Sequence, residues 1–496
     1  MPAHPFEAVN LISDPIHGYI ELTKRVAPAG AVVEGGAGHP DRPAESVAEE
    51  DLLDTPWVQR LRRISQLQSA RWVFPTAEHS RFTHGLGVMH EAGLWAAALY
   101  PSLRETLVAD TLAEGPASED PIPSEALVVE TMRVAGLLHD VGHGPFAHFF
   151  DDHVLSRFAA PPHVSRDPAK RLSHEDLSQA IIELELGGLI RELRRAPART
   201  LEGGGFESGE SIDPRWVSFL VSKPPLADPA MPLWVRRLQP LFSGVFTVDN
   251  LDYVRRDAYM TGVASGPIDA ERLRRYSFMT SRGLALYEPG LGALEQFLTA
   301  RLYLYDTIYF HRTVRAIDLD LAEAFGPSIR AIFGDGDPLT RLGDYLALDE
   351  YALLHQAALW ARGEMLTGSP EPGDSRVTAR IGELWRGILL RRPGWRAVRE
   401  VRRHFRADDL ADGAVERLRA ELLAPGTEGT SASELRVDLA EADSGPYARL
   451  DSGGQLIVAR RDGTLDTTAV SALLERLPAL VVIGRLYEPS VREAPV

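Results

Sequence analysis

Apolar residues recur every three to four positions over several long stretches of the chain, which is the period of an amphipathic helix. The stretch WVQRLRRISQL, after Thr55, shows this period, and so does HGLGVMHEAGLWAAALY, which begins at His84. The same pattern returns over residues 125–142, 173–194, 249–262 and 292–325. The hydrophobic pattern therefore predicts a mostly α protein.

Strand-like alternation is found near the two ends of the chain. It covers HGYIEL, residues 17–22, and the runs QLIVARR and ALVVIGRLYE within residues 434–496. Gly, Pro, Ser and acidic residues predict loops or connections over residues 27–50, 113–124 and 195–212. We predict a helical core over residues 1–325 with an N-terminal strand segment, followed by a smaller C-terminal α+β lobe over residues 326–496.

One apolar stretch, GLLHDVGHGPFAH at residues 136–148, carries an unusual number of titratable groups. Gly144 and Pro145 are expected to end the helix predicted over residues 125–142, because the residue before a proline is pushed out of the helical region. Pro145 also suits the first turn of a following helix. The stretch is therefore predicted to be a corner between two helices, with four titratable side chains: His139, Asp140, His143 and His148.

Composition narrows the chemistry. The chain has no cysteine, which excludes disulfides, thiolate metal sites and cysteine nucleophiles, so a metal would have to be bound by His, Asp or Glu. Its net charge of -17 argues against a protein that coats nucleic acid, and nucleic-acid binding is not favoured. We see no export signal and no apolar run that would cross a bilayer, and we expect a cytoplasmic protein with no membrane partner.

Four side chains are candidates for a metal site. His139 and Asp140 are adjacent, and consecutive residues of a helix point about 100° apart, so other elements must complete a shared shell. His84 and Asp249, at the starts of two other predicted helices, are available. Mixed imidazole and carboxylate ligation suits Mn, Fe, Ni, Mg or Zn with open positions for water, a hydrolytic arrangement. Spacing alone leaves a second interpretation open, in which these histidines are ordinary core groups.

Six ordered stretches make the signal more specific: DPIHGYIEL, DTPWVQRLRRISQL, FPTAEHSRFTHGLGVMHEAG, GLLHDVGHGPFAHFFD, SHEDLS and VDNLDYVRRD. Over residues 9–325 they closely resemble the HD-domain deoxynucleoside triphosphate triphosphohydrolases. The nearest likeness is to the branch that contains the SAM- and HD-domain dNTPase and its bacterial relatives, here with no SAM domain ahead of the match. The resemblance implies an HD-domain helical core and a divalent metal cofactor.

The resemblance also implies roles for individual residues. The metal ligands are His84, His139, Asp140 and Asp249. The catalytic positions are His143, His148, Asp151, His174 and Glu175. Arg81 matches a phosphate-binding arginine, Tyr253 and Asp257 match residues that hold the sugar, and Gln66 and Leu67 match the pair that presses on the deoxyribose.

The residues themselves support part of this assignment. His148 and Asp151 are three positions apart on one predicted helix, so the carboxylate can fix the ring of the histidine. The sequence from Ser173 to Asp176 is typical of a capping box, which places His174 in the first turn of a helix. Carboxylates at 151 and 175 would raise the pKa of His174 toward neutrality, as a general acid requires.

Two departures and one regulatory feature accompany the resemblance. Asp54, Gln59 and Arg62 fall where nucleotide-activated members build a guanine pocket at a subunit interface, which implies a nucleotide activator and a homo-oligomer, a dimer or a tetramer. Asn10 stands where the well-studied enzyme has a basic residue. Asn250 stands where that enzyme has a phosphate-gripping lysine, so we expect His311 and Arg312, with Arg315, to help bind a triphosphate.

The implied activity is metal-dependent hydrolysis of a deoxynucleoside triphosphate to a deoxynucleoside and tripolyphosphate, with Arg81 and His148 compensating phosphate charge and His174 protonating the leaving 5′ oxygen. One alternative is an HD phosphatase or phosphodiesterase acting on nucleoside monophosphates or cyclic nucleotides, in which His143 and His148 bind a second metal. Another is a nucleotide-sensing or nucleic-acid-binding regulator. The arginine-rich segment at 391–406 is interpreted as a solvated helix face, or else as part of an activator or single-strand site.

Overall fold

The computed structural model describes most of the 496 residues. The described ranges are 8–25, 47–114, 121–160, 169–198, 203–222, 230–364, 375–406, 413–424, 435–443 and 456–490. Helices dominate and are accompanied by three small sheets, which confirms the predicted mostly α class with an HD-type helical core. No helix in these ranges is long and apolar enough to cross a membrane.

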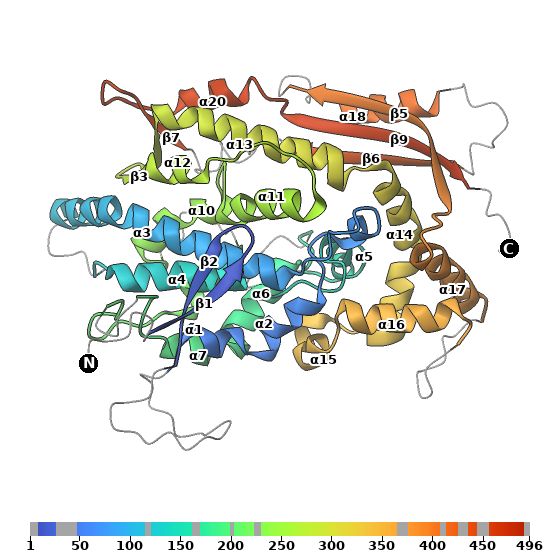
Figure 1. Ribbon diagram of the computed structural model, residues 1–496, viewed down its shortest axis with the longest axis horizontal. Helices are drawn as coiled ribbons and strands as arrows, with labels where there is room; N and C mark the ends of the chain where they lie inside the picture. Colours follow the sequence, from blue (N-terminus) through green and yellow to red (C-terminus); the bar gives the residue numbers. More distant parts are fainter. Residues whose placement is uncertain are drawn as a thin grey trace, which may run out of the picture.

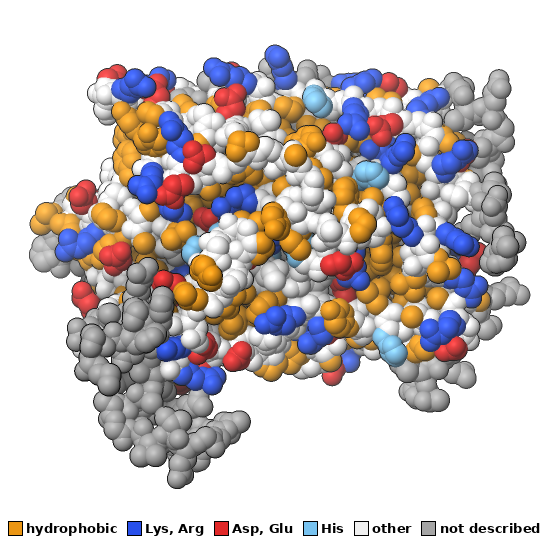
Figure 2. Space-filling view, viewed as in Figure 1, with side chains coloured by type: hydrophobic (Ala, Val, Ile, Leu, Met, Phe, Trp, Pro, Cys, Tyr) orange, Lys and Arg blue, Asp and Glu red, His pale blue; other side chains and the backbone are white. Residues whose placement is uncertain are grey.

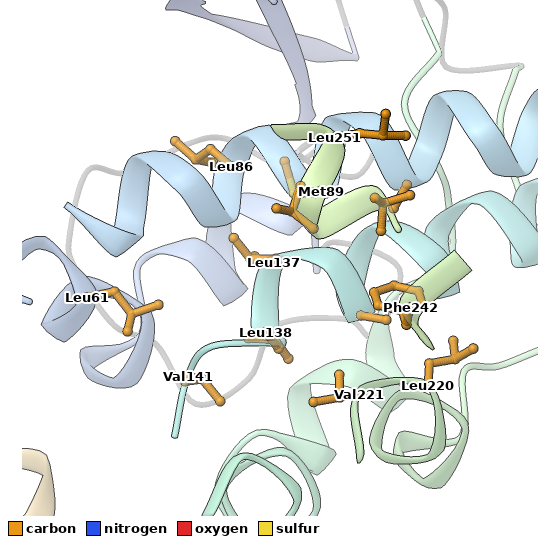
Figure 3. Packing of buried hydrophobic residues seen from close by; sticks show 14 of the residues in the cluster. Leu61, Leu86, Met89, Leu137, Leu138, Val141, Leu220, Val221, Phe242 and Leu251 are labelled. Carbon is orange, nitrogen blue, oxygen red and sulfur yellow. The ribbon is translucent and has the colours of Figure 1, made fainter. Parts of the chain in front are cut away.

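Two helices pack against each other along their length in the core. Helix α3, Arg81–Glu114, packs along α4, Glu125–Leu138, and Gly136 allows the close approach, because a Cβ there would lie 2.7 Å from the carbonyl oxygen of Val88. Figure 3 shows part of the resulting core, in which Met89 of α3 lies beside Leu137 of α4. The histidines that begin α3 and follow α4 are thereby held beside each other.

A third helix, α11, Val248–Thr261, lies between the α3–α4 pair and α13, Leu291–Leu304 (Figure 1). Its start is fixed by a capping box in which the Thr247 hydroxyl accepts from the Asn250 backbone N–H and the Asn250 side chain accepts from the Thr247 N–H. Gly262 ends it in the left-handed region, with φ of 72°. This confirms the helix predicted over 249–262.

The predicted corner exists, but its geometry differs from the prediction. Helix α4 ends at Leu138 rather than at residue 142, and α5, His148–His153, begins three residues after Pro145. Helix α6, His174–Ala180, packs directly on Gly142 and holds the turn after α4 out of helical geometry. A Cβ at residue 142 would overlap the carbonyl oxygen of His174. Phe146 and Ala147 adopt positive φ values of 58° and 47°, which are uncommon for residues with a side chain.

Other predicted helices are interrupted. Residues 173–194 form α6, a π-helical turn Ile181–Glu185 and α7, Gly187–Glu192. Residues 292–325 form α13, a π-helical turn Tyr305–Tyr309 and then α14, Arg312–Phe333, after a break at Phe310. After Thr55, only α2, Pro56–Arg60, and a 3-10 turn, Leu61–Arg63, are helical before the chain becomes extended. Hydrophobic period did not reveal these breaks because it continues through them.

The strands form three sheets. Strands β1, Val9–Asp14, and β2, Gly18–Thr23, make an antiparallel hairpin. A second sheet has the order β3-β4-β7-β8, with β3 Ser277–Thr280, β4 Gly283–Tyr287, β7 Ile457–Ala459 and β8 Leu465–Asp466; β4 and β7 are parallel. The third has the order β5-β9-β6, with β5 Trp395–Phe405, β9 Leu480–Pro489 and β6 Arg436–Asp443.

The arginine-rich segment is thus a β-strand rather than the helix face that we predicted. It lies at the edge of the third sheet and exposes alternate side chains. The loop predicted over 27–50 falls mainly at residues 26–46, and part of the connection over 113–124 falls at 115–120; both lie outside the described residues. The boundary predicted at residue 325 falls within α14, and the division into domains stays a prediction.

The remaining helices cover the core. One buried hydrophobic cluster extends from Ile20 in β2 to Leu474 in α20. The helices not yet named are α1 Glu49–Leu53, α8 Pro214–Ser222, α9 Leu233–Leu238, α10 Pro240–Ser243, α12 Ala270–Arg275, α15 Leu342–Leu346, α16 Glu350–Ala361, α17 Ser375–Leu389, α18 Ala414–Leu423 and α20 Thr468–Leu474.

Candidate active site

The four predicted metal ligands converge from three elements. His84 lies in the first turn of α3, His139 and Asp140 follow α4, and Asp249 lies in the first turn of α11. Asp249 Oδ1 is 3.1 Å from His84 Nε2 and 3.7 Å from His139 Nε2. His139 Nε2 is 3.3 Å from Asp140 Oδ1. Two imidazole nitrogens and two carboxylates therefore face one small volume.

His139 is prepared to act as a ligand. Its Nδ1 lies 2.8 Å from the carbonyl oxygen of Gly136, which accepts a hydrogen bond and so places the ring proton on Nδ1. Its Nε2 is buried and has no hydrogen-bond partner among the described residues. Burial lowers the pKa of His139, which keeps the ring neutral. A buried lone pair without a donor is directed into the cluster, which is what a metal ligand requires.

His84 is oriented by a carboxylate behind it. Its Nδ1 lies 2.8 Å from Oδ2 of Asp252, which is fully buried and also accepts from Arg256. Burial opposes charge on His84, but Asp249 and Asp252 raise its pKa to about 10. The surrounding carboxylates thus stabilise positive charge at this point. The donor set fits a divalent cation held by imidazole and carboxylate, with the ring of His84 fixed by its outer partner.

Arg81 contacts the cluster itself. Its guanidinium is paired with Oδ2 of Asp140, and although burial raises the pKa of Asp140, Arg81 and the neighbouring histidines lower it well below its usual value. The predicted phosphate-binding arginine therefore also keeps a predicted metal ligand ionised. Arg81 lines the cavity described below, and its Nε is buried with no partner in the described part of the chain.

A second cluster lies beside the first and contains the predicted catalytic residues. His174 Nδ1 is 2.5 Å from Asp151 Oδ2, whereas His148 Nδ1 is 3.4 Å from the same oxygen. The rings of His143 and His174 stack with centroids 3.7 Å apart. His143 Nε2 lies 3.4 Å from Asp140 Oδ1, which joins the two clusters. The four ligand-type atoms of His143, His148, Asp151 and His174 lie within 4.8 Å of one another.

The pKa values of two histidines in this second cluster are shifted in opposite directions. Burial lowers the pKa of His174, but Asp151 and then Glu175 outweigh it, so the net shift is upward. Burial, Arg81 and His174 lower the pKa of His143 well below its usual value, so its ring is neutral. Ser173 caps α6 through the predicted capping box with Asp176, which places His174 at the first helical position. His174 therefore holds a proton more readily than His143, over which its ring is stacked.

Both clusters open into one cavity of about 660 Å³. Predicted site residues that line it are Gln66, Leu67, Arg81, His84, His139, Asp140, His143, His148, His174, Glu175, Asp249, Asn250, Tyr253 and Asp257. Asp151 lies behind His174 rather than on the wall. The sequence therefore predicted most of one wall of a single pocket.

Of the rest of the cavity lining, only Arg315 was among the predicted residues. The last turn of α13, the π-helical turn and the N-terminal part of α14 contribute Arg301, Tyr305, Tyr309, Arg315 and Asp318. Arg301 Nε donates to the Tyr253 hydroxyl at 3.1 Å, and the Tyr309 hydroxyl donates to Asp257 Oδ2 at 2.5 Å. His79 Nε2 lies 2.9 Å from Asp257 Oδ1. Tyr253 and Asp257 are thus fixed by residues that no motif had identified.

His311 and Arg312 are not among the residues that line the cavity. The break at Phe310 rotates them away: His311 caps α14 through Nδ1, which accepts from the Thr313 N–H, and the carbonyl of Arg312 accepts from the Tyr487 hydroxyl at 3.0 Å. Of the three residues expected to help bind a triphosphate, only Arg315 lines the cavity, and Arg301 lines it as well. Asn250 does line the cavity, but its side-chain oxygen is used by the cap of α11.

The predicted activator residues lie together outside the cavity. Arg62 Nε donates to Gln59 Oε1 at 2.8 Å, and Gln59 Nε2 donates to the carbonyl of Leu53 at 2.9 Å, next to the exposed Asp54. Asn10, the departure from the family pattern, is hydrogen-bonded to Glu50. An activator site at this surface stays a prediction.

The arginines of β5 are largely paired. Arg402 binds Asp306, Arg403 binds Glu421, and Arg399 donates to carbonyls at the end of α18. On the face shown in Figure 2, Lys and Arg side chains are scattered among Asp and Glu and form no continuous basic band over the described residues. This pairing agrees with the low priority given to nucleic-acid binding.

Asp252 is a functional residue that could have been found. It lies three positions after Asp249 on a predicted helix, where its carboxylate is on a neighbouring face. Arg301 and Asp318 had no such signal, because only the packing of α13 and α14 brings them to the cavity.

Parts of this chain are similar to known proteins. Residues 81–212 match the family model of the HD domain. The chain is 29% identical over 326 residues to the uncharacterized protein YwfO of Bacillus subtilis, with 62% of each chain covered. It is 27% identical to the deoxynucleoside triphosphate triphosphohydrolase SAMHD1 of Gallus gallus, with 64% of this chain and 45% of that protein covered. It thus spans only about half to three-fifths of the length of these curated relatives.

Two solved structures share the fold over nearly the whole chain. One is a hypothetical protein from Aquifex aeolicus, with a TM-score of 0.61, 23% identity and coverage of 97% of this chain and 96% of that one. The other is a phosphohydrolase from Bacteroides thetaiotaomicron, with a TM-score of 0.58, 19% identity and coverage of 97% and 100%. At these identities the likeness concerns the fold.

Proposed function

Because this chain is an HD-domain protein with SAMHD1 triphosphohydrolases among its relatives, we propose that it hydrolyses deoxynucleoside triphosphates to a deoxynucleoside and tripolyphosphate. The observation that carries the proposal is the buried, partnerless Nε2 of His139, which faces His84, Asp140 and Asp249 at the wall of a cavity large enough for a nucleotide. A divalent ion bound there would polarise the α-phosphate and activate a water molecule.

The chain's own residues would perform the proton transfer and the charge compensation. Water would add its oxygen to the α-phosphorus and release one proton to the solvent, and the bond from that phosphorus to O5′ would break with its electron pair remaining on O5′. The three linked phosphates then carry the water oxygen as tripolyphosphate. Asp151 holds His174 through Nδ1, so Nε2 is the nitrogen free to give its proton to O5′. Arg81, which lines the cavity, would face the phosphate oxygens, and the exposed ring of His148 would supply a further donor.

The sugar would lie toward Gln66, Leu67, Tyr253 and Asp257. Asp257 is held on both sides by His79 and Tyr309, so its position is fixed before any ligand enters. Arg301 and Arg315 provide positive charge on the facing wall. We therefore propose that Arg315, rather than His311 or Arg312, helps to bind phosphate.

We further propose that the protein is cytoplasmic, forms a homo-oligomer, and responds to a nucleotide bound near Asp54, Gln59 and Arg62. The basis for the last point is the partial family match and the contact between Gln59 and Arg62 at an exposed surface.

Product analysis tests the proposal. The purified protein is incubated with Mn²⁺ or Mg²⁺ and a panel of dNTPs, rNTPs and cyclic nucleotides, with and without GTP or a second dNTP. Phosphate products are followed by phosphorus NMR, and nucleosides by reversed-phase chromatography with ultraviolet detection. We expect tripolyphosphate and deoxynucleoside in a fixed one-to-one ratio. Release of orthophosphate or pyrophosphate from every active substrate would refute this reaction.

A second candidate is supported by the second cluster. His143, His148, Asp151 and His174 are close enough to hold another ion, which would favour a dinuclear phosphatase or phosphodiesterase for nucleoside monophosphates or cyclic nucleotides. Under that reading His174 is a ligand and not an acid. The same product panel, combined with the number of bound ions per chain, separates the two candidates.

A further inference from the structure

We propose that Glu350 is a positioning residue for the active site, acting as a buried hydrogen-bond acceptor that fixes the corner carrying His143 and His148. This inference rests on the proposed function for its kinetic consequences, but its structural claim can be tested without activity. Glu350 begins α16, far along the chain from the HD motif, and no motif identified it.

The contacts of Glu350 join two walls of the site. It is completely buried, and its Oε1 accepts from the backbone N–H of Phe146 at 3.1 Å and from the backbone N–H of Ser65 at 3.1 Å. Its Oε2 accepts from Arg71 at 3.2 Å. Phe146 lies in the histidine-bearing corner, and Ser65 directly precedes Gln66 and Leu67, which line the cavity. One oxygen atom therefore ties the proposed catalytic and sugar-binding segments together.

Two neighbours hold the same corner from the same side. The Tyr345 hydroxyl donates to the carbonyl of Gly142 at 2.8 Å. Arg60, also fully buried, donates to the carbonyl of His143 at 2.7 Å and to that of Leu348 at 2.7 Å. The backbone of residues 142–146 is thus bound at three points by Arg60, Tyr345 and Glu350.

This bracing matters because the corner is strained. Phe146 and Ala147 have positive φ values, which are unfavourable for residues with a Cβ and persist only where surrounding contacts determine them. The strained segment leads directly into His148, whose ring must be placed against Asp151 and His174. A hydrogen bond to the Phe146 N–H therefore controls where the imidazole of His148 lies.

The proposed role requires Glu350 to accept hydrogen bonds and does not require a negative charge on its carboxyl group. Burial raises the pKa of Glu350 to about 7, although Arg71, the two backbone donors and Arg81 act in the opposite sense. The adjacent Asp349 is paired with Arg63, so it does not supply the contact. A protonated carboxyl keeps a carbonyl oxygen that accepts from both N–H groups, and the amide of Gln does the same.

This reasoning makes the isosteric Glu350→Gln variant the informative one. In Glu350→Gln we expect kcat for tripolyphosphate release to stay within about 3-fold of wild type. In Glu350→Leu, which removes the acceptor, we expect kcat to fall by at least about 10-fold with KM nearly unchanged, since small displacements of catalytic groups have effects of this size. Metal content should be unchanged in both, because the ligands come from α3, α4 and α11.

Hydrogen exchange followed by mass spectrometry tests directly whether Glu350 holds the backbone of this corner. We expect peptides that cover residues 142–150 to exchange on the order of 10-fold faster in Glu350→Leu than in Glu350→Gln. Should Glu350→Leu fail to fold, Tyr345→Phe removes one donor to the same corner without changing shape. Its matched control is Tyr100→Phe, because the Tyr100 hydroxyl also donates to one backbone carbonyl, that of Pro123 at 2.9 Å, away from the site.

The outcomes separate the two proposals. If Glu350→Gln is as defective in kcat as Glu350→Leu, the carboxylate acts through its charge and the inference is wrong. If the corner exchanges equally in all the variants, Glu350 does not hold it and the inference is also wrong. If wild type releases no tripolyphosphate from any nucleotide, the proposed function fails, and the exchange comparison alone decides whether Glu350 positions the corner.

Discussion

His174 Nδ1 lies 2.5 Å from Oδ2 of Asp151. The sequence pattern had paired this carboxylate with His148, its neighbour on α5, but His148 is 3.4 Å from the same oxygen. Asp151 therefore serves mainly the histidine that begins α6. This contact sets the ring orientation of His174 and favours its protonated form, which leaves Nε2 as the atom that can donate.

Replacing Asp151 with Asn should move the pH dependence of turnover. Asp151 raises the pKa of His174, and the acid form is the active one, so activity is lost as pH rises through that pKa. In Asp151→Asn we expect the alkaline limb of the kcat profile to shift to lower pH. Steady-state rates between pH 5.5 and 9.5 check this.

His174→Ala serves as the reference for that experiment. It should lose at least about 100-fold in kcat, the usual contribution of a general acid, and retain its bound metal. An alkaline limb that stays at the wild-type pH in Asp151→Asn would contradict the assignment of His174 as the acid.

Metal analysis should distinguish the two histidine clusters. His139→Ala removes a ligand whose Nε2 faces the other three, so we expect bound Mn²⁺ or Fe²⁺ to fall well below one ion per chain after dialysis. His148→Ala changes a side chain that is 64% exposed and belongs to the second cluster. If one ion is bound, His148→Ala should keep it. Loss of one of two ions in His148→Ala would instead support the dinuclear alternative.

Gly87 is required by the carboxylate behind His84. A Cβ at residue 87 would overlap Asp252 Oδ1 and the guanidinium of Arg256. We expect Gly87→Ala to destabilise the protein by about 1–3 kcal/mol and to weaken metal binding, because Asp252 can no longer hold His84. Gly188→Ala is the matched control, since a Cβ at that helical position meets nothing within 4 Å. Denaturant unfolding with metal analysis measures both effects.

Glu350 should make stability depend on pH in a defined direction. Its pKa is about 7 in the folded protein against 4.5 for an unperturbed Glu, so the folded state binds the extra proton between these values. The stabilisation is complete below about pH 4.5 and is lost as pH rises through about 7. Relative to wild type, Glu350→Gln should therefore gain stability as pH rises from 5 to 8, by up to about 3 kcal/mol. A constant difference between the two unfolding curves would contradict the raised pKa.

Arg301 offers a test of the wall that the motifs did not predict. It lines the cavity and binds the Tyr253 hydroxyl at 3.1 Å. We expect Arg301→Met to raise KM for the nucleotide by about 10-fold or more, because a cationic donor next to the substrate is lost. Arg330→Met, at an exposed position on α14, should leave KM unchanged.

The convergence of the four candidate metal ligands could be predicted because each belongs to a short stretch with a distinctive residue order. His84, His139, Asp140 and Asp249 were assigned in this way, and the structure brings them together. The capping box at Ser173 was equally predictable, since it depends on residues three positions apart. Features that depend on residues close together in the sequence could thus be predicted from the sequence.

The features of the site that were not predicted depend on contacts between segments that are distant in the sequence. Glu350 meets Phe146 across 204 positions, and neither residue carries a signal for the other. The break at Phe310, which turns His311 away and brings Arg315 in, interrupts a helical period that continues through it. In β5 the excess of arginine concealed a two-residue alternation, in which Trp395, Ala397, Arg399 and Val401 are half-buried and the residues between them are exposed.

The parallel pairing of β7 with β4 has a consequence for biosynthesis. Residues 285–287 of β4 gain their second neighbour only when residues 457–459 have been made, about 170 positions later. At translation rates of about 5–20 residues per second, one backbone edge of β4 therefore has no partner strand for on the order of ten seconds or more. Nascent chains on a shared messenger are crowded during that interval, so a codon change that slows translation between these strands would prolong the period in which neighbouring chains can pair wrongly.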